Sequence, residues 1–341
     1  MAKIHLTRCQ HLSPFVDILN GLGSPTASLL AKFRLPTSLE GKANHYVPIF
    51  SAIEFAEFAY RSQGIEDFGF HASRQLHFGH LSEKTRNLIG LSPTLLVALQ
   101  QTCKWASLED SNLSNWLERH DDHVRICSRL DGSKGLLHLE HSQWLQNIFP
   151  IYIVRQFAGP DWAPATIAFE ARYTPSPACQ SFWPRSRFLS GQEASWIDVP
   201  ISLLALPSRA TEDIPRLEDD EVAQSDFDII ETLKLMLPSY LDERAPVLAE
   251  IAEMAGLSTR SFQRKLSIAG LTYSGLLDSV RFENAIKLLR DTDSKIIDVA
   301  FSSGYTDPAH FTRAFRRISG VTPREFRRSA DIVVSAGRVS E

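Results

Sequence analysis

Apolar and small residues recur in the same order in two stretches within residues 246–328. Each stretch carries an alanine, a glycine four positions later, two apolar residues at helical spacing and a second glycine. Equivalent positions are 48 to 50 residues apart, and the pairs are Ala252 and Ala300, Gly256 and Gly304, Phe262 and Phe311, Leu266 and Phe315, and Gly270 and Gly320. This spacing indicates an internal duplication of a two-helix unit.

Each copy has the features of a helix-turn-helix motif. The alanine lets the first helix cross the second at close range, and the first glycine tolerates the positive φ of the turn. Ser258 and Thr306 follow as predicted N-caps of the second helix. The two apolar residues bury one face of that helix. The opposite face is therefore predicted to be free for DNA.

The first half of the chain has a different pattern, in which helical periodicity is followed by short alternating segments. The predicted helices cover residues 15–22, 25–33, 48–63, 92–105 and 143–157. The predicted strands cover residues 123–128, 136–140, 165–171, 187–189 and 195–199, the first two as a hairpin. These elements predict an α+β domain with a helical first half and one antiparallel sheet.

The charge distribution separates these regions. The whole chain of 341 residues has a net charge of only −4. Residues 256–328, however, hold 13 Lys and Arg against 7 Asp and Glu, whereas residues 211–228 hold eight acids and one Arg. Because the local charge of a surface decides its attraction to phosphate, the basic carboxyl-terminal region is predicted to bind DNA. The acidic run is predicted to be a solvated tether. In the alternative it rests against the two basic helix-turn-helix motifs. The predicted domains are a ligand-sensing or dimerisation domain (1–206), an acidic linker (207–228), a DNA-binding domain (229–329) and a flexible tail (330–341).

The duplicated region resembles the DNA-binding domain of the AraC family of bacterial transcription regulators. The second copy carries the resemblance at residues 297–305, 311–317 and 320–327, and the segment from Arg281 to Leu289 is similar to the family's linker helix. The first copy departs from the family pattern at residues 266–269. The resemblance implies an all-α domain with two helix-turn-helix motifs joined by a linker helix.

Residues on the free faces of the two second helices are the candidates for DNA contact. Base contacts are expected from Arg260, Gln263, Arg264, His310 and Arg313. Phosphate contacts are expected from Lys265, Arg316, Arg317, Thr322 and Arg327. Two alternatives stay open: His310 as a half-buried cap residue, and Arg281 and Arg327 as intramolecular struts.

A linker helix over residues 273–290 would be about 27 Å long at 1.5 Å per residue. That length suits two recognition helices about one turn of B-DNA apart, near 34 Å. One monomer is therefore predicted to read two successive major grooves.

The first domain resembles, more weakly, the arabinose-binding-type domain of one AraC branch, at residues 91–99, 175–184 and 197–204. The resemblance implies a sensor or oligomerisation domain. The predicted pocket for an unknown small-molecule effector is lined by Phe169, Phe182, Trp183, Phe188 and Trp196. In the alternative, these aromatic residues belong to the hydrophobic core. The protein is then a ligand-independent regulator whose first domain only dimerises.

Enzymatic and metal chemistry find little support in the sequence. His138 and His141 fall on a predicted strand, where they would not converge, so no metal site is expected. DNA-repair methyltransferases with an AraC-like module are a remote alternative, but they need clustered cysteines and a Pro-Cys-His motif, and here Cys179 is followed by Gln180. The four isolated cysteines indicate reduced thiols. We therefore expect no catalytic residue and no cofactor.

The remaining expectations concern partners and location. Residues 1–10 lack the apolar core of a signal peptide, and the longest apolar run, residues 148–154, is far shorter than the ~20 residues of a membrane span. A cytoplasmic location without membrane contact is expected. The expected partners are double-stranded promoter DNA, RNA polymerase, a small-molecule effector and a second copy of the chain. Activation is the commoner mode in the family that the chain resembles.

Overall fold

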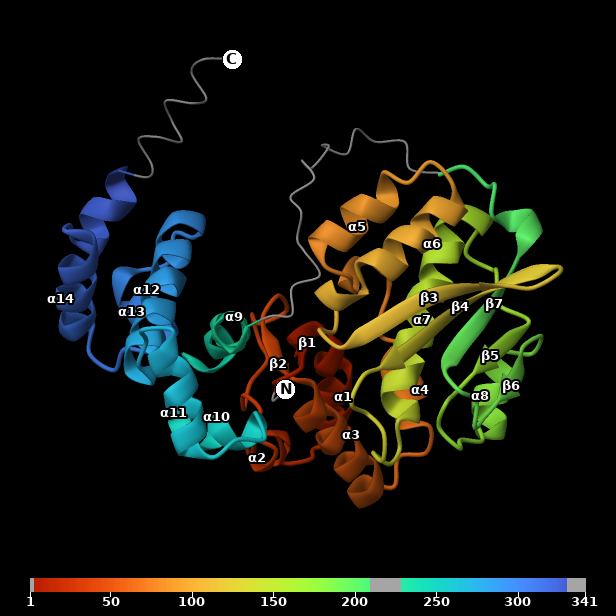
Figure 1. Cartoon of the computed structure of the whole chain (residues 1–341), viewed down its shortest axis with the longest axis horizontal. Helices are drawn as coiled ribbons and strands as arrows, with labels where there is room; N and C mark the ends of the chain where they lie inside the picture. Colours follow the sequence, from red (N-terminus) through yellow and green to blue (C-terminus); the bar gives the residue numbers. More distant parts are fainter. Residues whose placement is uncertain (1–2, 209–227, 330–341) are drawn as a thin grey trace, which may run out of the picture. The chain divides into compact units, whose positions relative to one another are not determined.

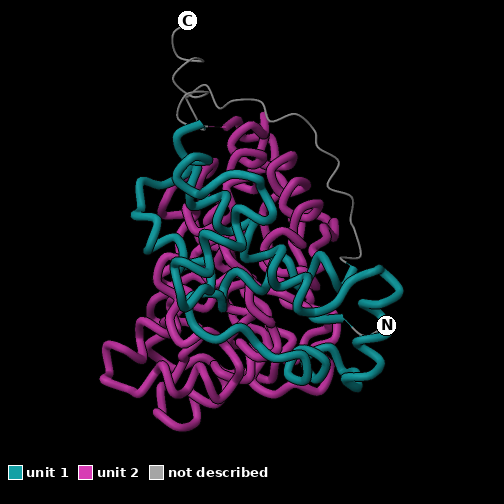
Figure 2. Tube along the Cα trace, turned by 90° about the vertical axis from the view of Figure 1, so that its left-hand side faces the viewer, with its two compact units in different colours: residues 1–4, 227–341 teal, residues 5–226 magenta. Residues whose placement is uncertain are grey.

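The computed structural model describes residues 3–208 and 228–329, which belong to two compact units (Figures 1 and 2). The N-terminal unit comprises His5–Asp226, and the helical unit comprises Phe227–Glu341 together with Met1–Ile4. Most of the predicted acidic linker and the whole predicted tail lie outside the described residues. Among the described helices, none combines the length and apolarity needed to cross a bilayer.

A five-stranded sheet forms the centre of the N-terminal unit (Figure 1). Its strands, in spatial order, are β3 (Leu113–Arg119), β4 (His123–Leu130), β7 (Ser195–Pro200), β5 (Thr166–Ala168) and β6 (Arg187–Leu189). All neighbouring pairs are antiparallel except β5 and β6, which are parallel. A separate two-stranded sheet pairs β1 (Leu6–Arg8) with β2 (Tyr46–Pro48). The predicted hairpin is wrong, because β4 pairs with β3 and β7 and not with residues 136–140.

The helices of the N-terminal unit come mainly before the sheet strands in the sequence, as predicted. They are α1 (Cys9–Gly21), α2 (Thr26–Lys32), α3 (Ile49–Gln63), α4 (Phe68–Ser73), α5 (Glu83–Gly90), α6 (Leu95–Lys104), α7 (Glu140–Ala158) and α8 (Pro177–Phe182). The predicted helices over residues 25–33, 48–63 and 143–157 correspond to α2, α3 and α7. Helix α1 begins six residues before its predicted start and continues through Pro14. Helix α3 ends where Gly64 takes a left-handed conformation with φ 64°.

The two larger apolar cores of the N-terminal unit join its sheet and its helices. In the first, Trp144 and Ile151 of α7 pack with Ile126 and Ile197 of the sheet. The second lies among helices α1 to α4 and includes Phe55. Each fully buried side chain of this size stabilises the fold by about 1.5 to 3 kcal/mol. Helix α7 is therefore the element around which the sheet and the helical layer are assembled.

The helical unit has the all-α architecture that the sequence predicts. Its helices are α9 (Ile229–Met236), α10 (Leu248–Met254), α11 (Thr259–Ile268), α12 (Tyr273–Asp291), α13 (Ile296–Ser302) and α14 (Pro308–Ser319), and residues 323–329 form a further helical turn. Helices α10 and α11 make the first helix-turn-helix, called here the first head, and α13 and α14 make the second head. Helix α12 joins the heads and packs on the second through Ala285 and Leu289.

Candidate nucleic-acid interface

The turns of the two heads have the same geometry. Gly256 has φ 64° and Gly304 has φ 81°, as the predicted role in the turn requires. The Leu257 amide donates to the Ala252 carbonyl at 2.8 Å, and the Tyr305 amide donates to the Ala300 carbonyl at 3.0 Å. The two copies of the sequence pattern thus form turns with the same backbone hydrogen bond.

The caps of the two recognition helices differ. Ser258 caps α11 as predicted, because its hydroxyl accepts from the Ser261 amide at 3.2 Å. Thr306 does not cap α14. The carboxylate of Asp307 accepts from the Ala309 and His310 amides at 2.9 and 3.2 Å, and Pro308 occupies the first helical position. The prediction missed that an aspartate directly before a proline is a better cap than the preceding threonine.

The inner faces of the recognition helices are buried as predicted. Phe262 and Leu266 of α11 and Phe311 and Phe315 of α14 are each at most 1% exposed. The crossing alanines are equally buried, so neither helix can rotate about its axis without opening its core. Burial of this face fixes which residues of α11 and α14 point outward.

All five predicted base-contact residues lie on the outward faces. Arg260, Gln263, Arg264, His310 and Arg313 are exposed. Arg264 and Arg313 each follow the buried phenylalanine of their helix by two positions, so they hold equivalent places in the two heads. The Arg313 Nη2 atom lies 3.9 Å from the Asp307 carboxylate, but both side chains are more than half exposed, so this pair stabilises little. His310 is no cap residue, since Asp307 holds that position.

The five predicted phosphate contacts divide into two groups. Lys265, Arg316 and Arg317 are exposed cations. Thr322 and Arg327 differ from these three, because both make hydrogen bonds within the fold. The Thr322 hydroxyl donates to the Glu325 carboxylate at 2.8 Å and accepts from the Glu325 amide at 3.3 Å. The Arg327 guanidinium donates to the Leu289 and Ser294 carbonyls at 3.3 and 2.7 Å.

Helix α12 is tied to the second head by polar contacts as well as by its core. The Asn284 amide donates to the Ser302 carbonyl at 3.0 Å. Arg281 donates to Asp278 at 3.4 Å, and its guanidinium carbon lies 5.7 Å from the ring centre of Tyr305. Arg327 thus joins the helical turn of residues 323–329 to the end of α12, whereas Arg281 pairs within α12 and meets the second head through Tyr305, so both make the intramolecular contacts of the alternative that the sequence left open. With 19 residues, α12 is about 28 Å long.

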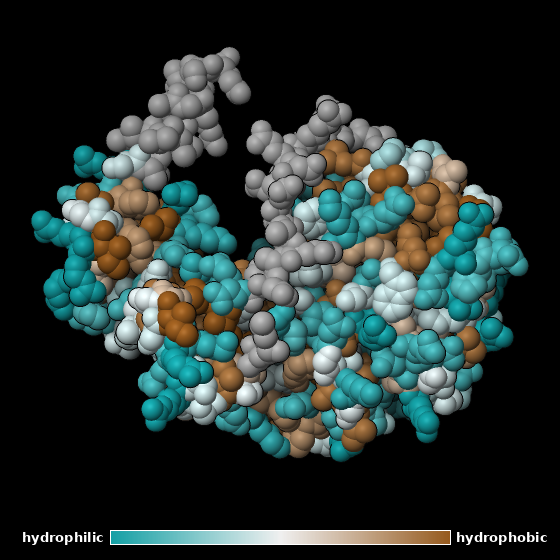
Figure 3. Space-filling model, viewed as in Figure 1, coloured by the Kyte–Doolittle hydropathy of each residue, from teal (hydrophilic) through white to brown (hydrophobic). Residues whose placement is uncertain are grey.

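Hydropathy alone does not outline the interface. The visible face of the helical unit mixes hydrophilic and apolar side chains (Figure 3). Ile297, Phe301 and Ile318 of the second head are each 46 to 47% exposed. The assignment of the DNA face depends instead on the outward direction of the arginines.

The five aromatic residues predicted to line an effector pocket do not converge. Phe169 and Trp183 are buried in the main core, with Phe188 packed against it. Trp196 lies in a different cluster with Cys127 and Ala168, and Phe182 is 47% exposed. Trp196 is separated from the other four because alternate residues of β7 face opposite sides of the sheet, which aromatic content alone does not reveal.

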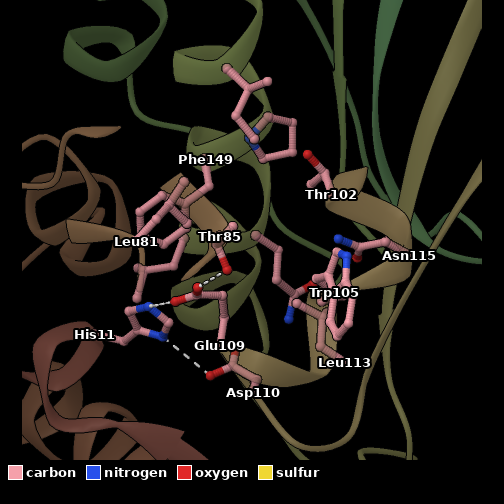
Figure 4. A pocket seen from close by; sticks show the side chains of 15 residues that line it. His11, Leu81, Thr85, Thr102, Trp105, Glu109, Asp110, Leu113, Asn115 and Phe149 are labelled. Carbon is pink, nitrogen blue, oxygen red and sulfur yellow. Dashed lines mark hydrogen bonds and ion pairs between the residues drawn. The ribbon is translucent and has the colours of Figure 1, made fainter. Parts of the chain in front are cut away.

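Two small apolar cavities lie elsewhere in the N-terminal unit. Their volumes are about 40 and 50 Å³, and their walls share His11, Asp110 and Leu145. Figure 4 shows the first, with Asn115 and Trp105 on one side and His11 on the other. The Asn115 Oδ1 and Gln146 Oε1 atoms in its wall accept no hydrogen bond from the described residues. Unpaired acceptors in an apolar wall suit a ligand that carries hydrogen-bond donors.

A buried charge network borders the first cavity through His11, Glu109 and Asp110. Arg8 donates to the Glu109 carboxylate at 3.2 Å and to the His80 carbonyl at 2.7 Å. Burial alone would lower the pKa of His11, but the charges of Asp110 and Glu109 and the hydrogen bonds to them outweigh burial and raise it to about 9. Burial would raise the pKa of Glu109, but His11, Arg8 and a hydrogen bond from Thr85 lower it to about 2. Sequence reasoning missed this network, because its members are about 100 positions apart.

The predicted divergence of His138 and His141 is also wrong. The segment is not a strand, since α7 begins at Glu140. One ligand atom each of His138, Glu140 and His141 lies within 4.8 Å of the other two. Burial lowers the pKa of His141 to about 3, so its imidazole is neutral. A helical turn brings together side chains that a strand would separate.

The thiols do not have the properties of a reactive cysteine. Cys9, Cys103, Cys127 and Cys179 are all free, and three of them are buried. Burial raises the pKa of the Cys179 thiol to about 12. A methyl-accepting cysteine requires thiolate character, which this environment opposes.

Sequence models of two protein families match the chain. A family described as "Helix-turn-helix domain" matches residues 251–329. A family described as "Arabinose-binding domain of AraC transcription regulator, N-term" matches residues 23–207, more than half of the chain.

Several curated proteins are similar to the carboxyl-terminal region. The HTH-type transcriptional activator RhaS of Escherichia fergusonii is 40% identical over 82 residues, which are 24% of this chain and 30% of that protein. The ornithine utilization regulator of Pseudomonas aeruginosa is 37% identical over 82 residues, 24% of each chain. The regulator VqsM of Pseudomonas aeruginosa is 34% identical over 97 residues, 28% of this chain and 30% of that protein. Each match thus spans less than a third of the relative's length.

Solved structures resemble the chain as well. The transcriptional regulator CdpR from Pseudomonas aeruginosa aligns over 89% of this chain and 96% of its own, with 17% identity and a TM-score of 0.41. The DNA-binding domain of AdpA in complex with a target DNA aligns over 27% of this chain and 83% of its own, with 28% identity and a TM-score of 0.24.

Proposed function

Since the chain belongs to the AraC family of DNA-binding transcription regulators, we propose that it activates promoters by placing its two heads in successive major grooves of one DNA face. Its relatives are transcription regulators and not enzymes, in agreement with the absence of catalytic function expected from the sequence. The relative RhaS is a transcriptional activator. RNA polymerase and a second copy of the chain are the proposed protein partners.

The observation that carries this proposal is the equivalence of Arg264 and Arg313. Each stands on the outward face of a recognition helix whose inward face is fully buried. An outward arginine in a major groove can donate two hydrogen bonds to guanine O6 and N7. The helix α12, about 28 Å long, joins the two heads, and a connector of this length is compatible with reading grooves one turn of B-DNA apart, near 34 Å.

Arg313→Ala is expected to weaken binding to the native operator by about 1 to 3 kcal/mol, roughly 5- to 150-fold, and to abolish preference at the base pairs read by the second head. Arg264→Ala is expected to do the same at the base pairs of the first head, displaced by about one helical turn. The measurement is a genome-wide footprint to find the operator, followed by titration of operator variants at one fixed salt concentration.

Arg290→Ala is the matched control, because it removes the same charge from the exposed end of α12, outside both recognition helices. It is expected to keep the base preferences of the wild type. If both head variants lost affinity equally for every sequence, the two arginines would contact only phosphate. If neither variant changed binding, the outward faces of α11 and α14 would not be the reading surface.

We further propose that a small molecule bound in the N-terminal unit controls the regulator. The match to an arabinose-binding-type domain supports a sensing role, and the two cavities beside His11 supply a site. Cavities of 40 and 50 Å³ hold about three waters each, so the effector must displace the wall side chains between them. The unpaired acceptors of Asn115 and Gln146 favour an effector with hydroxyl or ammonium donors on an apolar body.

A panel of amines and polyols is expected to contain compounds that raise the melting temperature of the full chain. At 100 times Kd the gain is about 2.7 kcal/mol, or on the order of 5 to 10 °C for a unit of this size. The substitution Asn115→Leu is expected to remove the effect, whereas Gln63→Met at the exposed end of α3 keeps it. The ligand-independent alternative would be favoured if no compound changed the affinity for the operator and if that affinity depended only on dimerisation.

A further inference from the structure

Three potential metal ligands meet where the loop before α7 enters the helix. The His138 Nδ1 atom lies 2.9 Å from the Glu140 carboxylate. The rings of His138 and His141 are nearly parallel, with centres 6.1 Å apart. One ligand atom from each of the three residues lies within 4.8 Å of the others. The cluster thus offers two imidazoles and one carboxylate in one place.

Neither ring nitrogen of His141 has a hydrogen-bond partner among residues 3–208 and 228–329. The residue is 3% exposed. A buried imidazole normally donates through one nitrogen and accepts through the other. A buried imidazole beside a second imidazole and a carboxylate has the ligand chemistry of a metal site.

The surrounding structure holds the cluster in this arrangement at some conformational cost. His138 has φ 55°, a left-handed conformation that non-glycine residues seldom adopt and that concentrates at functional sites. The backbone of His141 is pressed against α4, where a Cβ on Gly69 would lie 2.4 Å from the His141 Cα atom. The ring of Tyr60 from α3 lies 5.0 Å from both imidazole rings. The two histidines are therefore positioned by α3, α4 and α7 together.

We propose that His138, Glu140 and His141 bind a divalent transition-metal ion of the Zn²⁺ type. Imidazole nitrogen and carboxylate oxygen are ligands that Zn²⁺ and its neighbours accept, at about 2.0 to 2.2 Å. Tetrahedral ligands at that distance are roughly 3.4 Å apart. The His138 side chain is 30% exposed and therefore has room to adjust toward this spacing. Three protein ligands leave a fourth position for water or for a donor atom of a small molecule.

The test is titration of the chelator-treated full chain with Zn²⁺ by calorimetry and with Co²⁺ by visible absorption. We expect one ion per chain and the intense spectrum of tetrahedral Co²⁺ with nitrogen and oxygen ligands. His138→Ala removes the most exposed ligand, and Glu140→Gln replaces the carboxylate by an amide of the same shape. Both variants can therefore be tested even if His141→Ala does not fold. Each is expected to weaken binding about 100-fold or more.

His77→Ala is the matched control. His77 and His80 form another close histidine pair, with ring centres 4.0 Å apart, in an exposed turn of the same unit. This variant is expected to bind Zn²⁺ like the wild type. The proposal is overturned if no stoichiometric binding occurs, if binding survives His138→Ala and Glu140→Gln, if it is lost in His77→Ala, or if the Co²⁺ spectrum shows thiolate charge transfer.

Discussion

Glu109→Ala is expected to destabilise the N-terminal unit by about 3 to 5 kcal/mol, which lowers its melting temperature by on the order of 10 °C. The Glu109 carboxylate accepts from Arg8 at 3.2 Å, from Thr85 at 2.7 Å and from the Ser82 amide at 2.9 Å. Arg8 is 4% exposed and His11 is 5% exposed. Removal of the carboxylate takes from buried Arg8 the carboxylate that it pairs with and leaves His11 with Asp110 as its acidic partner. Calorimetry of the full chain measures the loss.

Arg61→Ala provides the comparison for this variant. Arg61 pairs with Glu57 at 3.0 Å across one turn of α3, but its side chain is 54% exposed. Water screens such a pair, so the expected change is below about 0.5 kcal/mol. Equal losses in Glu109→Ala and Arg61→Ala would mean that Glu109 is solvated in solution and that the network does not support the fold.

The pH dependence of stability separates loss of charge pairing from loss of packing. The pKa of His11 is raised from 6.5 to about 9, so its stabilising effect is complete below pH 6.5 and disappears as pH rises through 9. The pKa of Glu109 is lowered from 4.5 to about 2, so its effect is complete above pH 4.5 and disappears as pH falls through 2. The wild-type unit should therefore lose stability between pH 6.5 and 9.5. In Glu109→Ala this alkaline loss should be shallower, whereas a purely steric defect would leave its slope unchanged.

The sequence predicted the helical unit more completely than the N-terminal unit, and the reason is physical. In a helix-turn-helix the informative residues are close in sequence: Ala300, Gly304 and Phe311 define the crossing, the turn and the buried face within twelve positions. Local rules on spacing and φ therefore suffice. The prediction of Thr306 as the cap is wrong only because Asp307, which is also a good cap residue, stands next to it.

The N-terminal unit depends on contacts between distant segments, which one sequence does not reveal. The predicted hairpin failed because β4 pairs with β3, which precedes it, and with β7, about 70 residues later, and not with residues 136–140. The aromatic pocket failed because Trp196 and Ile197 face opposite sides of one strand. The network around Glu109 could not be predicted, because Arg8 is buried only through the packing of β1 against segments that are distant in sequence.

Gly304→Ala is expected to destabilise the helical unit by roughly 3 kcal/mol, whereas Gly256→Ala, at the equivalent position of the first head, costs about 1 kcal/mol. Both glycines are left-handed, with φ 81° and 64°, so each alanine pays the conformational penalty of about 1 to 2 kcal/mol. Their surroundings differ. A Cβ on Gly304 would lie 2.9 Å from the Leu241 carbonyl oxygen, whereas a Cβ on Gly256 meets nothing within 4 Å.

The difference between the two variants measures the steric contribution to the loss of stability, because both have the same substitution in the same kind of turn with a similar backbone strain. For a unit of about 100 residues, 1 kcal/mol corresponds to about 4 to 8 °C in melting temperature, so Gly304→Ala should melt more than 10 °C below the wild type. Hydrogen exchange should place its loss in α13 and α14, and DNA titration should show weaker reading by the second head alone. Since the Leu241 carbonyl belongs to backbone, it cannot yield as a flexible side chain would. Equal melting temperatures for the two variants would therefore show that the segment after α9 moves freely against the second head.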